Sequence, residues 1–164
     1  MADMAANDEL IARIDAAERR LAVLAEADRP GGLTDPDEGG TERWEAGQVW
    51  AHIGEFVPYW HRQMRVVIDA YPGTPASFGR TRTDPGRISS IEANRDVPIA
   101  QQMSGTHAAI VDFVSYASSL TPEEWSAVGL HPVRGEMTAH DIAERFIVDH
   151  LEEHADQLDR LQPS

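Results

Sequence analysis

The sequence predicts an all-α fold, a four-helix bundle, on three observations. Four segments carry apolar residues at the helical period, over 8–27, 45–70, 97–119 and 138–161. No segment has the alternation typical of a strand, and stretches rich in proline and glycine separate the four. Each segment is long enough to form a bundle helix. Because 164 residues is the size of one ordinary domain, we expect a single domain over 1–164.

The first two helices supply much of the predicted core. The first is expected over 8–27, with Asn7 as its N-cap. The second is expected over 45–70, with a kink or local loosening at Pro58, which lies inside the apolar pattern. Its apolar face comprises Val49, Ile53, Phe56, Trp60, Met64, Val67 and Ile68.

A long connection, 71–96, follows the second helix. It contains the arginines Arg80, Arg82 and Arg87, and residues 89–94 are expected to form a short helix. Loops of this length inside a compact domain are usually functional or carry structure of their own. We expect Arg80 or Arg82 to bind an anionic substrate or a thiol cofactor, since guanidinium groups match carboxylates in shape. Surface ion pairs with the many acidic residues are the alternative.

The C-terminal half is predicted to contain the other two bundle helices. The third helix, over 97–119, has Asp96 as its candidate cap. Residues 129–135 are expected to form a loop. The fourth helix is expected to start at Thr138, with Asp141 three residues later in the capping-box position.

The composition excludes several kinds of chemistry. The formal net charge is -14, from 28 acidic and 14 basic residues, which argues against nucleic-acid binding. Every basic residue is arginine, so a lysine Schiff base is excluded, and the absence of cysteine excludes disulfides, thiolate ligands and a cysteine nucleophile. We find no leader and no apolar run of membrane-spanning length. We therefore expect a soluble, cytoplasmic protein with no membrane partner.

Two histidines in the last helix form a candidate pair of metal ligands. His150 and His154 lie four residues apart in slots of the apolar stripe, so both rings face the core and can converge on one point. The neighbouring carboxylates of Asp149, Glu152 and Glu153 are expected to orient a ring N–H. No zincin or di-iron motif accompanies the pair, which leaves a mononuclear site.

His52 is the candidate third ligand. It lies between Val49 and Phe56 on the second helix and is expected to face the bundle interior. Three histidines leave coordination positions open, as in catalytic sites, and zinc, nickel, iron or manganese would fit. A lone core histidine is more often simply hydrogen-bonded, and that alternative applies to His52 taken alone. His131 is expected either to line the mouth of a pocket or to have a structural role in a turn.

Two regions of the chain resemble signatures of the DinB-like (YfiT-like) metalloenzyme superfamily. Residues 44–52 (WEAGQVWAH) resemble the signature of its second helix. Residues 131–138 (HPVRGEMT), then Asp141, then residues 150–158 (HLEEHADQL) resemble its C-terminal signature. Each motif is loose by itself, but their order and spacing together are specific.

The resemblance implies an up-down-down-up bundle with a long crossover between helices two and three. It implies that His52, His150 and His154 occupy the positions of the metal ligands. Characterised relatives include mycothiol-dependent maleylpyruvate isomerase and bacillithiol S-transferases, some relatives have been called metal-dependent hydrolases, and homodimers are common. We therefore expect a homodimer that acts on a small-molecule substrate.

The residues and the resemblance together predict a divalent-metal-dependent enzyme. The expected activity is that of a transferase or isomerase using a low-molecular-weight thiol, such as mycothiol, activated at a mononuclear three-histidine site. The catalytic group is a metal-bound water or thiol, and no protein residue is assigned as general base, although Glu55 lies one turn from His52. The alternatives are a metal-dependent hydrolase, a non-catalytic metal- or small-molecule-binding stress-response protein, and a bundle that binds no metal.

Overall fold

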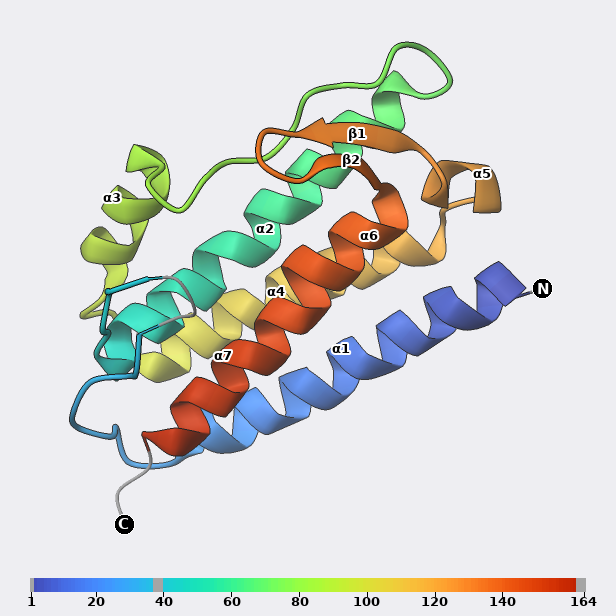
Figure 1. The fold of residues 1–164 in the computed structure, drawn as a ribbon. Coiled ribbons are helices and arrows are strands. Elements are labelled where there is room, and N and C mark those ends of the chain that lie inside the picture. The colour runs from blue at the N-terminus through green and yellow to red at the C-terminus, as the bar shows by residue number, and fades with distance from the viewer. Residues whose placement is uncertain (1, 37–39, 162–164) are drawn as a thin grey trace.

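Four long helices lie side by side in the computed structural model, which describes residues 2–36 and 40–161 (Figure 1). They are α1 (Ala2–Glu26), α2 (Ala46–Ala70), α4 (Ile99–Ser118) and α7 (Asp149–Arg160). Helices α1 and α2 each contact both α4 and α7. The prediction of a mainly helical chain is confirmed, while the order of helix directions stays a prediction. No described helix is long and apolar enough to cross a membrane.

Helix α2 lies at the centre of the core, as its apolar pattern predicts. All seven residues of the predicted apolar face are buried. The helix runs without interruption through Pro58. Its start is fixed by a capping box in which Glu45 and Gln48 each bind the main chain of the other.

The connection after α2 carries a helix of its own, α3 (Pro85–Asn94), which packs against α2. It starts four residues before the predicted short helix, because Asp84 caps it by accepting from the backbone N–H of Arg87 at 2.9 Å. The N-caps predicted for the first and third bundle helices are wrong. Helix α1 begins at Ala2, so Asn7 lies inside it, and Pro98 rather than Asp96 is the N-cap residue of α4.

A β-hairpin replaces the predicted loop at 129–135. After the short helix α5 (Pro122–Trp125), strands β1 (Val128–His131) and β2 (Gly135–Thr138) pair antiparallel. The expectation of no strands is therefore wrong. Each strand has only four residues, and Gly129 faces inward, where an added Cβ would meet Phe78 at 2.8 Å. An inward glycine leaves no apolar alternation for a sequence pattern to detect.

The last helical segment is one continuous run with a π-helical insertion. It comprises α6 (Ala139–Ala143), the π-helix η1 (Glu144–Val148) and α7. The predicted capping box of Thr138 and Asp141 is confirmed. The expectation of one regular helix is wrong in its middle, where η1 buries the three consecutive residues Phe146, Ile147 and Val148. π-helical turns often occur at functional sites, and this one ends two residues before His150.

Candidate metal centre

Three histidines from two helices converge in the bundle. One ring nitrogen each of His52, His150 and His154 lies within 4.8 Å of the others. The ring of His52 on α2 is 5.5 Å from that of His150 and 4.9 Å from that of His154, between centroids. His52 and His154 are each only 3% exposed, and His150 is partly exposed. The structure thus brings together the three residues that the spacing singled out.

Hydrogen bonds fix the ring orientation of two of these histidines. Nδ1 of His52 lies 2.8 Å from Oε1 of Glu55, and Nδ1 of His154 lies 2.6 Å from Oε1 of Gln157. Carboxylate and amide oxygens accept hydrogen bonds, so each Nδ1 carries the proton and each Nε2 keeps its lone pair. A metal-ligating histidine has this arrangement, with its second nitrogen donating to an acceptor. The donor set therefore fits a divalent transition-metal ion.

Glu55 also binds Arg80, which links the histidines to the long connection. One guanidinium nitrogen of Arg80 lies 2.6 Å from both carboxylate oxygens of Glu55. The guanidinium also lies over the ring of Tyr59, 3.8 Å from its centroid. Arg80 is thus engaged by its neighbours, and Glu55 orients His52 instead of standing free as a base.

The carboxylates next to His150 have other partners than predicted. Arg13 of α1 donates to Asp149 at 2.8 Å and, through Nε, to Glu152 at 2.9 Å. Glu153 accepts from Arg145 at 3.2 Å. Arg13 therefore ties Asp149 and Glu152 of α7 to α1. The hydrogen bonds that orient the rings of His52 and His154 are accepted by Glu55 and Gln157.

Aromatic rings enclose the three histidines. The ring of Phe56 lies 4.7 Å from that of His150 and 5.8 Å from that of His154. Trp44 stacks against His154 at 6.3 Å and meets His52 edge-on at 5.2 Å. These apolar faces keep water away from the inner side of the site, which strengthens electrostatic interactions within it.

A cavity of about 740 Å³ opens onto the outer side of the site. His52 and His150 line it, and His154 does not. The wall carries six of the 14 basic residues of the chain together with three acidic ones, Asp35, Glu153 and Asp156. The six are Arg80, Arg82, Arg87, Arg134, Arg145 and Arg160. A protein with a net charge of -14 thus surrounds this cavity with cationic groups.

Solved structures share this architecture. YfiT from Bacillus subtilis, described as a probable metal-dependent hydrolase with an unusual four-helix bundle topology, aligns with a TM-score of 0.73. The alignment has 14% identity and covers 94% of this chain and 85% of YfiT. The chain has the YfiT fold.

The mycothiol-dependent maleylpyruvate isomerase has the same fold over part of its length. Its structure aligns with a TM-score of 0.72 and 10% identity, over 93% of this chain and 60% of the isomerase. A histidine-to-alanine variant of that isomerase aligns with a TM-score of 0.70, at the same identity and coverage. No protein-family model matches this chain, and no curated protein sequence matches it.

Within this YfiT-fold bundle, two of the three histidines are held in the neutral state that binds metal. Burial lowers the pKa of His52 and of His150 well below the ordinary value, and the charge that neighbouring His154 would carry lowers it further. Neutral imidazole is the ligating form, so little proton release is needed for binding at neutral pH.

These lowered pKa values predict that the metal-free protein loses stability as the pH falls below about 6.5, the ordinary histidine pKa. Below this pH the two histidines bind protons in the unfolded chain but stay neutral in the folded protein. Each histidine therefore lowers the free energy of unfolding by about 1.4 kcal/mol per pH unit, until the pH reaches its pKa in the folded state. We expect the free energy of unfolding, measured by denaturant titration between pH 7 and 5, to fall by up to about 2.7 kcal/mol per unit. A His52→Gln, His150→Gln double variant should lose this slope; an unchanged slope would contradict the burial of neutral rings.

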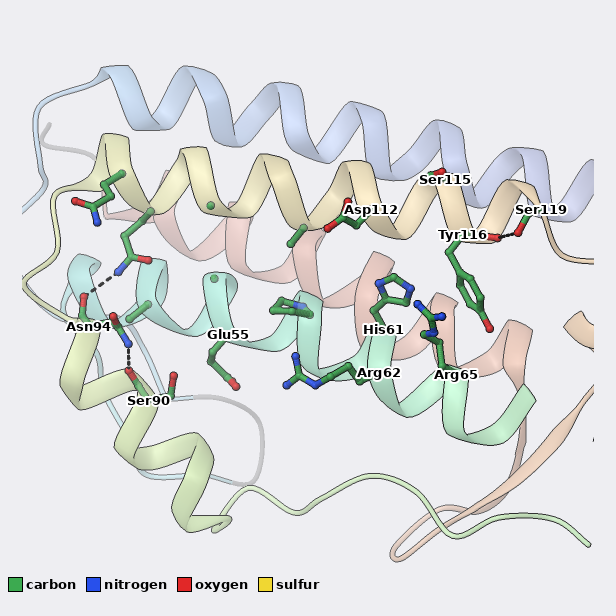
Figure 2. A pocket seen from close by; sticks show the side chains of 17 residues that line it. Glu55, His61, Arg62, Arg65, Ser90, Asn94, Asp112, Ser115, Tyr116 and Ser119 are labelled. Atoms are coloured by element: carbon green, nitrogen blue, oxygen red, sulfur yellow. Dashed lines mark hydrogen bonds between the residues drawn. The ribbon is translucent and has the colours of Figure 1, made fainter. Parts of the chain in front are cut away.

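A second cavity, of about 870 Å³, lies between α2, α3 and α4. Figure 2 shows Glu55, His61, Arg62 and Arg65 lining it from α2, with Asp112 on the facing α4. It contains none of the three clustered histidines. This second cavity is the larger of the two. We nevertheless assign the candidate chemistry to the first cavity, the arginine-lined cavity, because His52 and His150 line it. Glu55 lines this second cavity while its carboxylate binds His52 and Arg80.

Removing the Glu55 carboxylate is expected to weaken metal binding. In a Glu55→Ala variant, His52 loses the acceptor for its Nδ1–H and the Arg80 cation loses its counter-charge beside the site. We expect an affinity for Zn²⁺ about 10- to 100-fold lower, as for other partners of ligating histidines, measured by competition with a chelator. Glu92→Ala is the matched control, because Glu92 is exposed and pairs with Arg95 away from the histidines. Equal losses in both variants would contradict the orienting role.

Proposed function

We propose that this protein is a divalent-metal-dependent enzyme, a transferase or isomerase that acts with a low-molecular-weight thiol such as mycothiol. His52, His150 and His154 would hold one zinc, nickel, iron or manganese ion. The observation that carries the proposal is the convergence of three imidazoles, two of which lie in the wall of an arginine-lined cavity. Three protein ligands leave a coordination position for an exogenous group, which is the pattern of catalytic sites.

The chemistry divides between the ion and the chain. A bound divalent ion would lower the pKa of a coordinated thiol or water, so that thiolate or hydroxide is available near neutral pH. The chain contains no cysteine, so a thiol has to come from a small molecule. Glu55 and Gln157 hold the ligand rings in position, and Phe56 and Trp44 exclude water from the inner side.

The cationic wall favours an anionic small-molecule substrate or cofactor. Arginine binds carboxylates through paired N–H groups, and several cationic side chains together raise the local concentration of anions. Arg80 already binds Glu55. Arg82 lines the same cavity, and both arginines are our candidates for contact with substrate.

An Arg82→Gln variant is expected to bind an anionic substrate or thiol cofactor about 10- to 100-fold more weakly, the usual cost of losing a hydrogen bond to a charged group. The Michaelis constant should rise with little change in turnover number, because the interaction is made in the ground state as well. Arg62→Gln, which alters an arginine of the other cavity, is the control. An unchanged Michaelis constant in Arg82→Gln would remove this residue from the substrate site.

Cobalt substitution tests the proposed use of a thiol. The protein is loaded with Co²⁺ and titrated with mycothiol, bacillithiol or glutathione, and its absorption spectrum is recorded. A thiolate-to-cobalt charge-transfer band that saturates supports thiol binding at the ion, since soft thiolates bind such metals well. Consumption of the thiol with an electrophilic substrate would then identify the transfer. No band with any thiol would contradict the thiol-dependent proposal.

A metal-dependent hydrolase is the second candidate. The open cavity gives water the same access to His52 and His150 that a thiol would have, and YfiT is described as a probable hydrolase. Metal-dependent cleavage of ester or amide substrates without thiol would favour this activity. Tight metal binding with neither reaction would favour a non-catalytic binding protein.

A further inference from the structure

A fourth histidine lies in the wall of the arginine-lined cavity, away from the metal cluster. His131 ends strand β1 and is only 7% exposed. It lines the cavity together with His52 and His150, yet it makes ring contacts with Trp60, Phe78 and Phe146 and none with the three clustered histidines. The metal chemistry proposed above leaves this imidazole without a role.

The hairpin turn fixes which nitrogen of His131 carries the proton. The backbone N–H groups of Val133 and Arg134 both donate to Nδ1, each at 3.2 Å. A nitrogen that accepts hydrogen bonds has no proton, so the neutral ring has its proton on Nε2. Nε2 is itself buried. The main chain of Arg80 interacts with the ring, but no partner meets Nε2 with ordinary hydrogen-bond geometry among the described residues. A buried donor that lacks a partner costs free energy unless a ligand or water satisfies it.

The ring is also held in place. It stacks on Phe146, with the centroids 5.1 Å apart and the planes inclined by 25°. On another side, Gly79 approaches so closely that a Cβ there would lie 2.6 Å from Cδ2 and 3.0 Å from Nε2 of His131. Gly79 has a φ of 90°, in the region that favours glycine. The donor therefore has a preset direction.

The surroundings of His131 favour its neutral form. Burial, and then the charge of Arg134, lower its pKa, whereas the main chain of Arg80 acts in the opposite direction. Two N–H groups aimed at Nδ1 also oppose a second proton on the ring. A neutral N–H donor of fixed direction favours a ligand oxygen at one position, whether or not that oxygen is charged. The surrounding guanidinium groups instead favour ligands that carry a negative charge.

We propose that the Nε2–H of His131 is a hydrogen-bond donor to a carbonyl or carboxylate oxygen of the small molecule that enters this cavity. His131 would thereby position the substrate beside the three histidines. The inference rests on the proposed function in requiring a small-molecule ligand there, but it does not require the metal. The competing role is a structural one, in which Nε2–H serves only to hold the main chain at Arg80.

The test uses nitrogen-detected NMR of the full chain, with pyruvate as the probe because it carries both kinds of oxygen. In the free protein we expect the His131 signals of an Nε2-protonated neutral ring. Addition of pyruvate should shift Nε2 in a saturable way. A ring protonated on Nδ1, or an Nε2 signal that pyruvate does not move at any concentration tested, would overturn the proposal.

Two variants separate positioning from structure. His131→Phe keeps an aromatic ring without the donor, and its affinity for pyruvate should fall by about 10-fold or more. His131→Gln keeps an N–H donor and should recover most of that loss. Equal weakening in both variants, or none in His131→Phe, would leave only the structural role.

Repeating the titrations with and without bound Zn²⁺ keeps the two proposals apart. Pyruvate binding that depends on His131 in a protein that takes up no Zn²⁺ would support this inference and contradict the metal-dependent function. Zn²⁺ uptake with pyruvate binding that is indifferent to His131 would do the reverse.

Discussion

Replacing His154 with alanine is expected to lower the affinity for Zn²⁺ by more than about 100-fold, because losing a ligand costs more than losing the partner of a ligand. His154 is 3% exposed, and one of its ring nitrogens lies within 4.8 Å of those of the other two histidines. Two remaining imidazoles would bind a transition metal only weakly and without the geometry that the site provides. Calorimetric titration of the metal-free protein measures the change.

His107→Ala is the matched control for this variant. The side chain of His107 is 63% exposed and pairs with Glu18 on the bundle surface. The variant removes an imidazole of the same chemistry from a different place, so the metal affinity should stay at the wild-type value. Circular dichroism should show both variants folded. A His154→Ala protein that is folded and binds Zn²⁺ as tightly as the control would exclude His154 as a ligand.

Replacing Leu151 with alanine is expected to destabilise the fold by about 2–5 kcal/mol, the usual cost of a large-to-small change in a close-packed core. Leu151 is fully buried and lies between the two histidines of α7. The variant leaves a cavity next to the site, so the free energy of unfolding should fall in denaturant titrations of the metal-free protein.

Leu33→Ala provides the comparison for this loss. Leu33 is 48% exposed, and truncation at such a site usually changes stability by less than about 0.5 kcal/mol. If Leu151→Ala were no more destabilised than Leu33→Ala, the result would contradict the burial of Leu151 between α7 and the rest of the bundle. Added Zn²⁺ should stabilise the Leu151→Ala protein if its histidines still converge, since a ligand that binds only the folded state raises its stability.

The bundle helices and the three histidines were predictable because both depend on helical periodicity. A four-residue step places His150 and His154 on one face of α7, and the apolar residues around His52 fix which face of α2 is buried. These are local properties that a single sequence carries. The convergence of the two faces then follows from the packing of α2 against α7.

The partners of the ligands illustrate what periodicity alone does not decide. Glu55 follows His52 by three residues, and Gln157 follows His154 by three, so both lie within reach along their own helices. The sequence also offers Asp149, Glu152 and Glu153 near the same rings. Arg13, which lies more than 130 residues away in the chain, binds two of these carboxylates. Only the tertiary structure shows which acidic groups are already engaged.

The arginine-lined wall and the donor of His131 depend on still longer-range structure. The cationic groups come from the connection after α2, from the hairpin turn and from the last helical segment. The hairpin escaped prediction because its strands are short and one inward residue is Gly129. Since the hairpin turn supplies the two N–H groups that fix the His131 ring, the role of this residue could not be separated from a turn role by sequence.

Elemental analysis of the untagged protein, purified without chelators and then incubated with zinc, nickel, iron or manganese, tests the metal site most directly. We predict about one equivalent of a transition metal per chain, because the three imidazoles form one mononuclear site. A His150→Ala, His154→Ala double variant should retain none. Wild-type protein that binds none of the four metals would contradict the central claim, and the cavity would then be a site for small molecules without metal chemistry.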